Sequence, residues 1–243
     1  MGADAAVAVA VDVVLLSLAR SGDDSRLVVL ATRRRGPAAA ADAEPVWALP
    51  GGRVADDEDL EAAAQRWLRD RGGVSAVRHL EQLATFGAPD RDPRGRVVSV
   101  SYLALLPEPV PAAPAAAWWP ATGPQAAPGT APATASGPPA LAYDHDEILT
   151  AAVTRLRGKL TYSTVAYGLL PDAFTFAELQ RAYEAVLGHR LDKRNFRKKV
   201  LALGMLDTAP GQRRGPHRPA QLYRFRRRGV ALLDDVISTS PRT

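Results

Sequence analysis

The chain has 243 residues, 47% of them hydrophobic, and it contains no cysteine. This length and apolar content allow one large or two modest domains, and the lack of cysteine excludes disulfides and cysteine–zinc sites. No run of eighteen apolar residues occurs, so the sequence predicts no membrane contact and favours a cytoplasmic protein.

Charge is distributed unevenly along the chain, whose net charge is +5. Residues 174–243 carry 15 Lys and Arg against 6 Asp and Glu, whereas residues 1–173 carry 16 against 20. A basic module of this kind often meets a polyanion, although a solvated basic face would have the same composition.

The first part of the chain has the pattern of an α/β domain. The N-terminal apolar run lacks a basic leader and is interrupted by Asp12, which favours a core strand over a signal segment. Gly72 and Gly73 are expected to end the first helix. The predicted elements are strands at 7–18, 26–31, 77–89 and 96–107, a helix from about 57 to 71, and loops at 36–46 and 90–95. Gly22 indicates a hairpin turn between the first two strands.

Residues 107–139 are dominated by proline, alanine and glycine. Such a segment buries too little surface to offset its ordering entropy, so most of it is expected to be mobile. The paired Trp118 and Trp119 are the exception, and we expect them to dock a short segment onto the first domain.

Beyond Tyr143 the sequence predicts helices and then a hairpin. Asp144 is placed to cap one helix, with Glu147 three residues later, and Thr175 with Glu178 forms a capping box for another. A further helix begins at Asp192. Strands at 205–209 and 220–226 then flank the loop 210–219. Helix, turn, helix and basic hairpin is the order of a winged helix-turn-helix.

The helix that begins at Asp192 is predicted to lie in the major groove of DNA, and the hairpin tip is predicted to reach phosphates or a minor groove. Asn195 and Arg197 are expected to face bases and the other cations mainly phosphate. A basic helical hairpin that only packs on its neighbour is the alternative. The candidate DNA-binding residues are Lys193, Arg194, Asn195, Arg197, Lys198, Arg213, Arg214, His217 and Arg218.

The stretch from Gly52 to Val74 resembles the Nudix box, in which a glycine, a glutamate and an arginine precede three metal-binding glutamates. Six residues match at the family's spacing, namely Gly52, Glu58, Arg66, Leu68, Gly73 and Val74. The first of them ends the segment WALPGG at 47–52. The three glutamates are replaced by Trp67, Asp70 and Arg71. The resemblance implies a Nudix α/β/α sandwich.

The replaced positions lie at helix spacings that present carboxylates on one face to hard divalent cations. Trp67 offers no oxygen ligand, Asp70 is one methylene shorter than glutamate, and Arg71 opposes a cation. We therefore expect no metal and no hydrolysis, although residual activity stays open. Asp70 is expected to pair with Arg66, and Arg71 to meet a diphosphate bidentately or to lie exposed.

The segment 82–106 resembles the ADP-ribose-directed branch of the Nudix family. Arginines in the 90–95 loop and at the end of the second strand, Arg34 among them, are candidates for an anion cradle; a turn held by an Asp–Arg contact is the alternative for the loop. The candidate ligand-binding residues are Arg33, Arg35, Trp47, Gly51, Gly52, Arg66, Arg71, Arg91 and Arg94.

Apart from its ends and residues 107–139, the chain resembles the Nudix-related transcriptional regulators of bacterial NAD metabolism. The segments carrying this include LAYDHDEIL, LDKRNFRKKVL and HRPAQLYRF. The resemblance implies a homodimeric repressor that binds a palindromic operator in double-stranded DNA, regulates NAD synthesis or salvage genes, and is released by ADP-ribose with no required cofactor. The expected divisions are a Nudix-like sensing domain at 1–143, a connecting helical segment at 144–173 and a winged helix at 174–243.

Three alternatives stay open. The first is an active ADP-ribose pyrophosphatase with a nucleic-acid-binding tail, which Glu58 and Asp70 favour. The second is a regulator that responds to another signal, such as NAD or a phosphorylated sugar. The third is an adaptor whose winged helix binds only protein.

Overall fold

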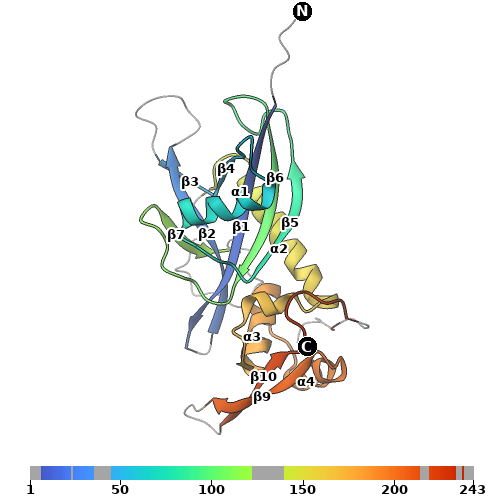
Figure 1. Cartoon of the computed structure of the whole chain (residues 1–243). Coiled ribbons are helices and arrows are strands. Elements are labelled where there is room, and N and C mark those ends of the chain that lie inside the picture. The colour runs from blue at the N-terminus through green and yellow to red at the C-terminus, as the bar shows by residue number, and fades with distance from the viewer. Residues whose placement is uncertain are drawn as a thin grey trace, which may run out of the picture.

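The computed structural model describes residues 7–22, 24–35, 45–121, 140–213, 219–233 and residue 237. In this part of the chain a mixed β-sheet has helices on both faces, and a smaller region of helices and strands follows it (Figure 1). The expectation of an α/β domain followed by a winged helix is therefore confirmed.

The large sheet has the order β3-β2-β1-β6-β5, with β4 paired to β1 and β7 paired to β2. β1 and β2 form the expected antiparallel hairpin, and β1 runs parallel to β6 on its other side. The strands are β1 (Ala8–Ser21), β2 (Asp24–Arg35), β3 (Pro45–Ala48), β4 (Gly51–Arg53), β5 (His79–Phe86), β6 (Val97–Leu106) and β7 (Ala116–Pro120).

β1 is buried on both faces because its apolar residues are nearly continuous. Val11, Val13 and Leu15 pack with α1 (Leu60–Trp67), whereas Leu16 and its alternate neighbours pack toward α2 (His145–Tyr162). Asp59 caps α1 by accepting from the Ala62 N–H, so the helix starts slightly later than predicted. The chain continues as a π-helix, η1 (Leu68–Gly72), which ends at Gly73 with φ of 73° as expected.

Of the proline-rich segment, residues 107–121 are part of the described structure. Trp118 and Trp119 lie in β7, opposite Leu30 and Val29 of β2, so the expected docking of the tryptophan pair is confirmed. The indole of Trp119 meets that of Trp47 edge to face, with centroids 5.3 Å apart. Residues 122–139, where mobility was also predicted, lie outside the described residues.

The smaller region has the expected order of a winged helix. α3 (Phe176–Leu187) begins with the predicted capping box of Thr175 and Glu178, and it ends at Gly188 with φ of 81°. α4 (Lys193–Ala202) follows, capped by Asp192. The strands β8 (Phe174–Thr175), β10 (Ala220–Phe225) and β9 (Leu206–Arg213) form a three-stranded sheet in that order.

The two regions share one continuous core. Buried residues of β1 and β2 belong to the same cluster as those of α2, α3 and the 3₁₀ helix η2 (Val165–Leu169). Ion pairs add polar links between the regions, including Arg190 with Asp24 at 2.8 Å and Arg20 with Glu178 at 3.7 Å. A movement of one region is therefore transmitted through packed side chains to the other.

Among the helices that the structure describes, none combines the length and the apolar character needed to cross a bilayer.

Candidate ligand site and nucleic-acid interface

The frame of the Nudix box is held by Glu58 and Arg66. The guanidinium binds both carboxylate oxygens, at 2.7 Å from Nε and 2.6 Å from Nη2, and it also donates to the Arg53 carbonyl. The hydrogen bonds from Arg66 hold the pKa of Glu58 below its ordinary value. The predicted pair of Arg66 with Asp70 is therefore wrong, because Arg66 forms its ion pair with Glu58 through Nε and Nη2.

The indole of Trp67 fills the space beside Gly52. A Cβ added at Gly52 would lie 2.4 Å from the Trp67 ring, so only glycine fits there. The indole Nε1 donates to the Arg53 carbonyl at 3.2 Å. The guanidinium groups of Arg66 and Arg71 lie 4.6 and 5.3 Å from the ring centroid. An aromatic ring flanked by two cations thus occupies the position where the box would place a carboxylate.

These residues do not fit a divalent cation. Magnesium requires several oxygen ligands in near-octahedral geometry. Glu58 is bound to Arg66, Trp67 has no oxygen, and Arg71 adds positive charge beside the exposed Asp70. The described residues contain no group of three His, Asp or Glu side chains placed to hold a metal ion.

A buried network of four polar residues lies next to the box loop. Asp12, at the centre of β1, accepts from Ser99 at 2.6 Å and from Arg91 at 3.2 Å. Arg91 also binds both carboxylate oxygens of Asp144, at 2.8 and 2.7 Å. We call Asp12, Arg91, Asp144 and His145 the Asp12 network. Burial opposes ionisation of Asp12, but its partners outweigh burial and hold its pKa well below the ordinary value.

His145 links this network to the WALPGG loop. Its Nδ1 accepts the Leu49 N–H at 2.9 Å, which assigns the ring proton to Nε2, and Nε2 lies 3.4 Å from Asp12 Oδ1. A Cβ at Gly51 would lie 2.3 Å from the same oxygen, so the loop also needs glycine there. His145 is the first residue of α2, and the box loop is thereby tied to the helix that leads to the winged helix.

The structure differs from the expectation for Arg91, because this side chain is buried and serves the Asp12 network instead of pointing outward. Asp144 is at the N-cap position of α2 without capping it, since its carboxylate binds Arg91. Arg94 is half exposed and binds Asp92 through two hydrogen bonds. The loop is therefore held by Asp–Arg contacts, the alternative that the sequence left open.

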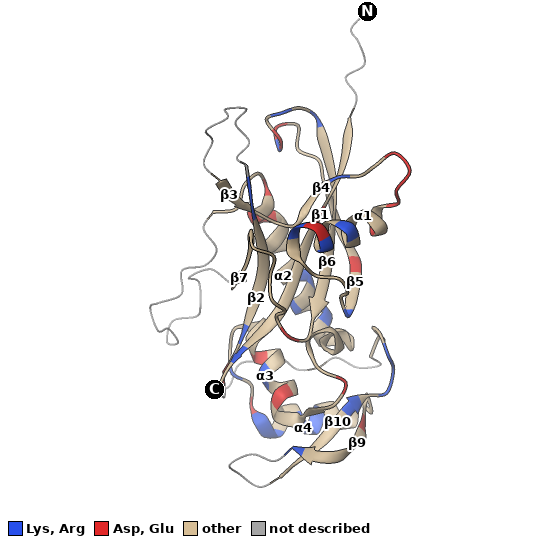
Figure 2. Cartoon of the chain, turned by 60° about the vertical axis from the view of Figure 1, so that its left-hand side comes forward, with Lys and Arg blue, Asp and Glu red and all other residues tan. Residues whose placement is uncertain are grey.

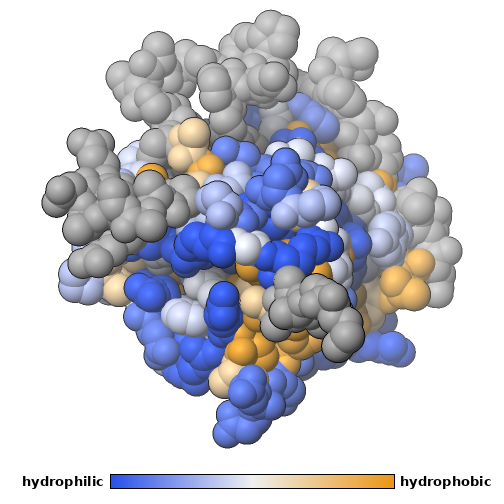
Figure 3. All heavy atoms as spheres, turned by 90° about the horizontal axis from the view of Figure 1, so that it is seen from above, coloured by the Kyte–Doolittle hydropathy of each residue, from blue (hydrophilic) through white to orange (hydrophobic). Residues whose placement is uncertain are grey.

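Cations and aromatic rings meet at the ends of β2 and β3. Arg33 lies 5.6 Å from the Trp47 ring centroid, and Arg34 and Arg94 each lie 5.4 Å from that of Tyr143. We call these five residues the aromatic–arginine cluster. Tyr143 has a φ of 62°, a left-handed conformation that costs a non-glycine residue roughly 1–2 kcal/mol. Seen from above, the molecule is mostly hydrophilic, with small apolar areas (Figure 3).

Of the other predicted ligand residues, Gly51, Gly52, Arg66 and Arg71 lie together at the box, and Trp47, Arg33 and Arg94 lie in the aromatic–arginine cluster. Arg35 ends β2, and its side chain lies outside the described residues.

The candidate DNA-binding face is the outer side of α4. Phe196 and Val200 are buried against α3, which leaves Lys193, Arg194 and Lys198 exposed. Lys and Arg are concentrated on α4 and the neighbouring hairpin, whereas Asp and Glu line the loop before α1 (Figure 2). Asn195 is exposed on the first turn of α4. The arrangement suits an anionic, rod-shaped partner.

Two predicted DNA contacts have partners within the chain. Arg197 donates to the Tyr223 hydroxyl at 3.1 Å and lies 4.7 Å from the Phe176 ring centroid, and Arg213 pairs with Glu178 of the capping box. Either side chain would have to leave these partners to reach DNA. Arg214, His217 and Arg218 lie outside the described residues.

Sequence reasoning missed Asp12, Asp144 and His145. One signal was available for Asp12, because an aspartate inside an uninterrupted apolar strand must find buried partners. Nothing in the sequence connects it with residues 91, 144 and 145.

Comparison with known proteins matches two family models to the chain. A family model described as the NUDIX domain matches residues 8–131, and one described as the NrtR DNA-binding winged helix domain matches residues 166–225. An Acinetobacter baylyi protein described as the ADPR responsive transcriptional repressor NtrR is 37% identical over 186 residues. That match covers 74% of this chain and 69% of the relative.

Two solved structures are similar over nearly the whole chain. Shewanella oneidensis NrtR complexed with a 27mer DNA has a TM-score of 0.69 at 29% identity, covering 90% of this chain and 93% of that one. A MutT/nudix family protein from Enterococcus faecalis has a TM-score of 0.70 at 28% identity, covering 91% and 89%. The chain therefore belongs to the NrtR family, in which a Nudix domain is joined to a DNA-binding winged helix domain.

Proposed function

We propose that this protein is a transcriptional repressor whose Nudix domain senses ADP-ribose, or a related NAD metabolite, without hydrolysing it. The observation that carries the proposal is the pairing of an intact Nudix frame, with Trp67 and Arg71 on its metal-binding face, and a basic winged helix. The Acinetobacter relative, described as an ADPR responsive repressor, supports the choice of ligand.

Hydrolysis of a diphosphate needs its charge neutralised and a water activated, and Nudix enzymes use divalent cations for both. The box of this chain supplies arginines in place of most of the cation ligands. In this proposal Arg71 and Arg94 would meet phosphate oxygens, and the rings of Trp47 and Tyr143 would offer flat surfaces for a base. The cations and rings that lie close together at these positions support it. Binding would then need no cofactor.

For the DNA-binding half we propose that α4 enters the major groove with Lys193, Arg194 and Lys198 on phosphates and Asn195 toward bases. A homodimer would present two such helices to a palindromic operator, with half-sites one helical turn apart. Arg197 and Arg213 would join the contact only after exchanging their internal partners for DNA.

We propose that the Asp12 network couples ligand binding in the Nudix domain to DNA binding by the winged helix. It joins the box loop through Leu49 and the 87–96 loop through Arg91 to the first turn of α2. A ligand that draws either loop toward itself changes the hydrogen bonds that position this helix. The ligand weakens DNA binding only by the difference of its affinities for the two states.

A fluorescence anisotropy titration with operator DNA tests the proposal, using DNA upstream of genes for NAD synthesis or salvage. The account expects tight binding at moderate salt and release by ADP-ribose. Binding that ADP-ribose leaves unchanged would favour a regulator of another signal, and absence of DNA binding would favour an adaptor. Steady formation of AMP with magnesium would favour the pyrophosphatase.

A further inference from the structure

A cavity of about 660 Å³ lies where the two domains meet and shares no residue with the Nudix box. Its walls come from the start of β5, from η2 with the segment after it, and from the end of β10 with the loop that follows. Its lining includes a single carboxylate, that of Asp172. It also includes five arginines, which are Arg78, Arg224, Arg226, Arg227 and Arg228.

The positive charge of this cavity is only partly compensated. Arg78 pairs with Asp172, and Arg226 binds Asp207 at 2.9 Å. Arg224 and Arg227 are exposed and have no ion pair within the described part of the chain, and Arg228 is exposed beside Asp172. Cations gathered in a concave site raise the local concentration of anions, and guanidinium groups bind phosphate bidentately.

The cavity also has aromatic walls in fixed positions. Tyr167 and Phe225 are half-buried lining residues. The Tyr167 hydroxyl lies 3.1 Å from His79 Nδ1 and donates to the Arg78 carbonyl at 3.3 Å, while Phe225 packs against Phe174. A ligand that combines phosphates with a ring would find partners for both parts.

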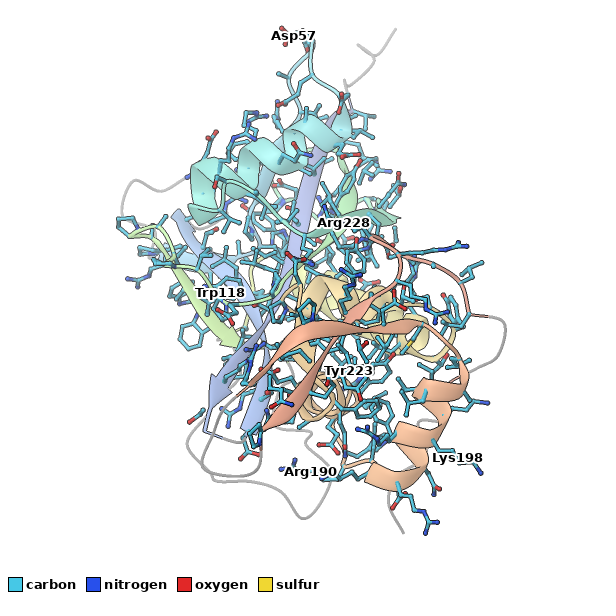
Figure 4. All side chains as sticks on the ribbon, turned by 60° about the horizontal axis from the view of Figure 1, so that its bottom comes forward. Asp57, Trp118, Arg190, Lys198, Tyr223 and Arg228 are labelled. Carbon is cyan, nitrogen blue, oxygen red and sulfur yellow. The ribbon has the colours of Figure 1, made fainter. Side chains whose placement is uncertain are left out.

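Its position separates this cavity from the proposed DNA contact. In the β9–β10 hairpin, Phe225 pairs with Leu206 at the end away from the tip. Arg228 lies on the side of the winged helix that faces the large sheet, apart from Lys198 on α4 (Figure 4). Arg78 and Tyr167, which line it, come from outside the winged-helix hairpin. The volume is within the range of small-molecule sites, roughly 300–1,000 Å³.

We propose that this cavity is a second ligand site, which binds a small molecule carrying two or more linked phosphates, such as a nucleoside diphosphate or triphosphate. Such a ligand bridges Arg78, the residue before β5, with Arg224 and Arg227 of the winged helix, and so fixes how the two domains are held together. The site goes beyond the proposed function and does not depend on the Nudix box.

The test titrates inorganic triphosphate into the full-length protein by calorimetry at low salt. The Arg224→Gln/Arg227→Gln variant should lose at least tenfold in affinity. Arg26→Gln, which removes an exposed arginine from β2 outside both sites, should leave it unchanged. Arg224→Lys/Arg227→Lys, which retains charge but not bidentate geometry, should lie between.

Unchanged melting temperatures would show that the variants are folded, and crystals soaked with triphosphate should show it between Arg78 and Arg227. An equal loss in the Arg26 variant would overturn the proposal, because binding would then be diffuse. An unchanged affinity in the Arg224→Gln/Arg227→Gln variant would also overturn it, because triphosphate would then bind elsewhere, such as at the Nudix face. So would absence of triphosphate binding, in particular if the Arg224/Arg227 variant binds DNA more weakly, since the cavity would then be part of the DNA interface.

Discussion

The box segment of the Nudix domain and the helical pair of the winged helix follow their sequence patterns in different ways. Around α1 the frame is kept, with Gly52, Glu58 and Arg66 in place, while the side chains that would bind metal are exchanged. Around α3 and α4 both the frame and the chemistry are kept, with a complete capping box and an exposed basic face. The first arrangement suits the proposed binding of a ligand without a metal ion, and the second suits the proposed contact with DNA.

The largest expected effect comes from restoring the box, because this would remove the difference between the two regions. We expect Trp67→Glu/Asp70→Glu/Arg71→Glu to bind magnesium and to form AMP from ADP-ribose about 1,000-fold faster than the parent chain, a change of about 4 kcal/mol in the barrier. Calorimetry with magnesium and chromatography of the products measure the two effects. If the parent chain already forms AMP as fast as the triple variant, the proposed loss of hydrolysis in the Nudix domain would be contradicted.

Next in size is the Asp12 network. Arg91→Ala leaves Asp12 and Asp144 without their shared partner, and breaking a buried ion pair costs about 3–5 kcal/mol. Urea unfolding of the variant should show this loss. Arg94→Ala is the matched control, because Arg94 lies in the same loop but is half exposed and pairs with Asp92. It should cost under about 1 kcal/mol. Equal costs would mean that the network does not hold the domain together.

The packing of α2 on the large sheet should weaken in acid through Glu81. Burial would raise its pKa, but hydrogen bonds from His79 and Lys159 lower it to about 2. Because the folded pKa is lowered, its stabilisation is complete above the ordinary pKa of 4.5 and is lost as pH falls toward 2. The loss should be roughly 2–3 kcal/mol. Unfolding free energies across this range should fall less steeply for Glu81→Gln; identical slopes would contradict the assignment.

The smallest effect sharpens the description of the DNA-binding face. Lys198→Ala should weaken operator and unrelated DNA alike, by roughly tenfold, and should reduce the slope of log affinity against log salt by about one. Anisotropy titrations at several salt concentrations measure both. A loss confined to the operator would make Lys198 a base contact instead.

Local patterns in the sequence predicted the elements well, because the hairpin of β1 and β2, the capping box and the glycine-ended helices depend on residues close in the chain. Burial of the tryptophan pair was also predictable from composition. The Asp12 network was not, since residues 12, 91, 144 and 145 meet only after the sheet and α2 are assembled. Arg66 was assigned the wrong partner for a different, local reason. A partner was expected one turn away on its own helix, but the turn before the helix brings Glu58 to the guanidinium.

The central claim is that the Nudix domain binds its ligand without a cation and thereby releases DNA. Anisotropy of labelled operator, titrated with ADP-ribose in a buffer containing EDTA, tests this most directly. The account predicts that ADP-ribose lowers the DNA affinity at least tenfold while all of it is recovered intact. Release that appears only when magnesium is restored, with AMP accumulating, would contradict it.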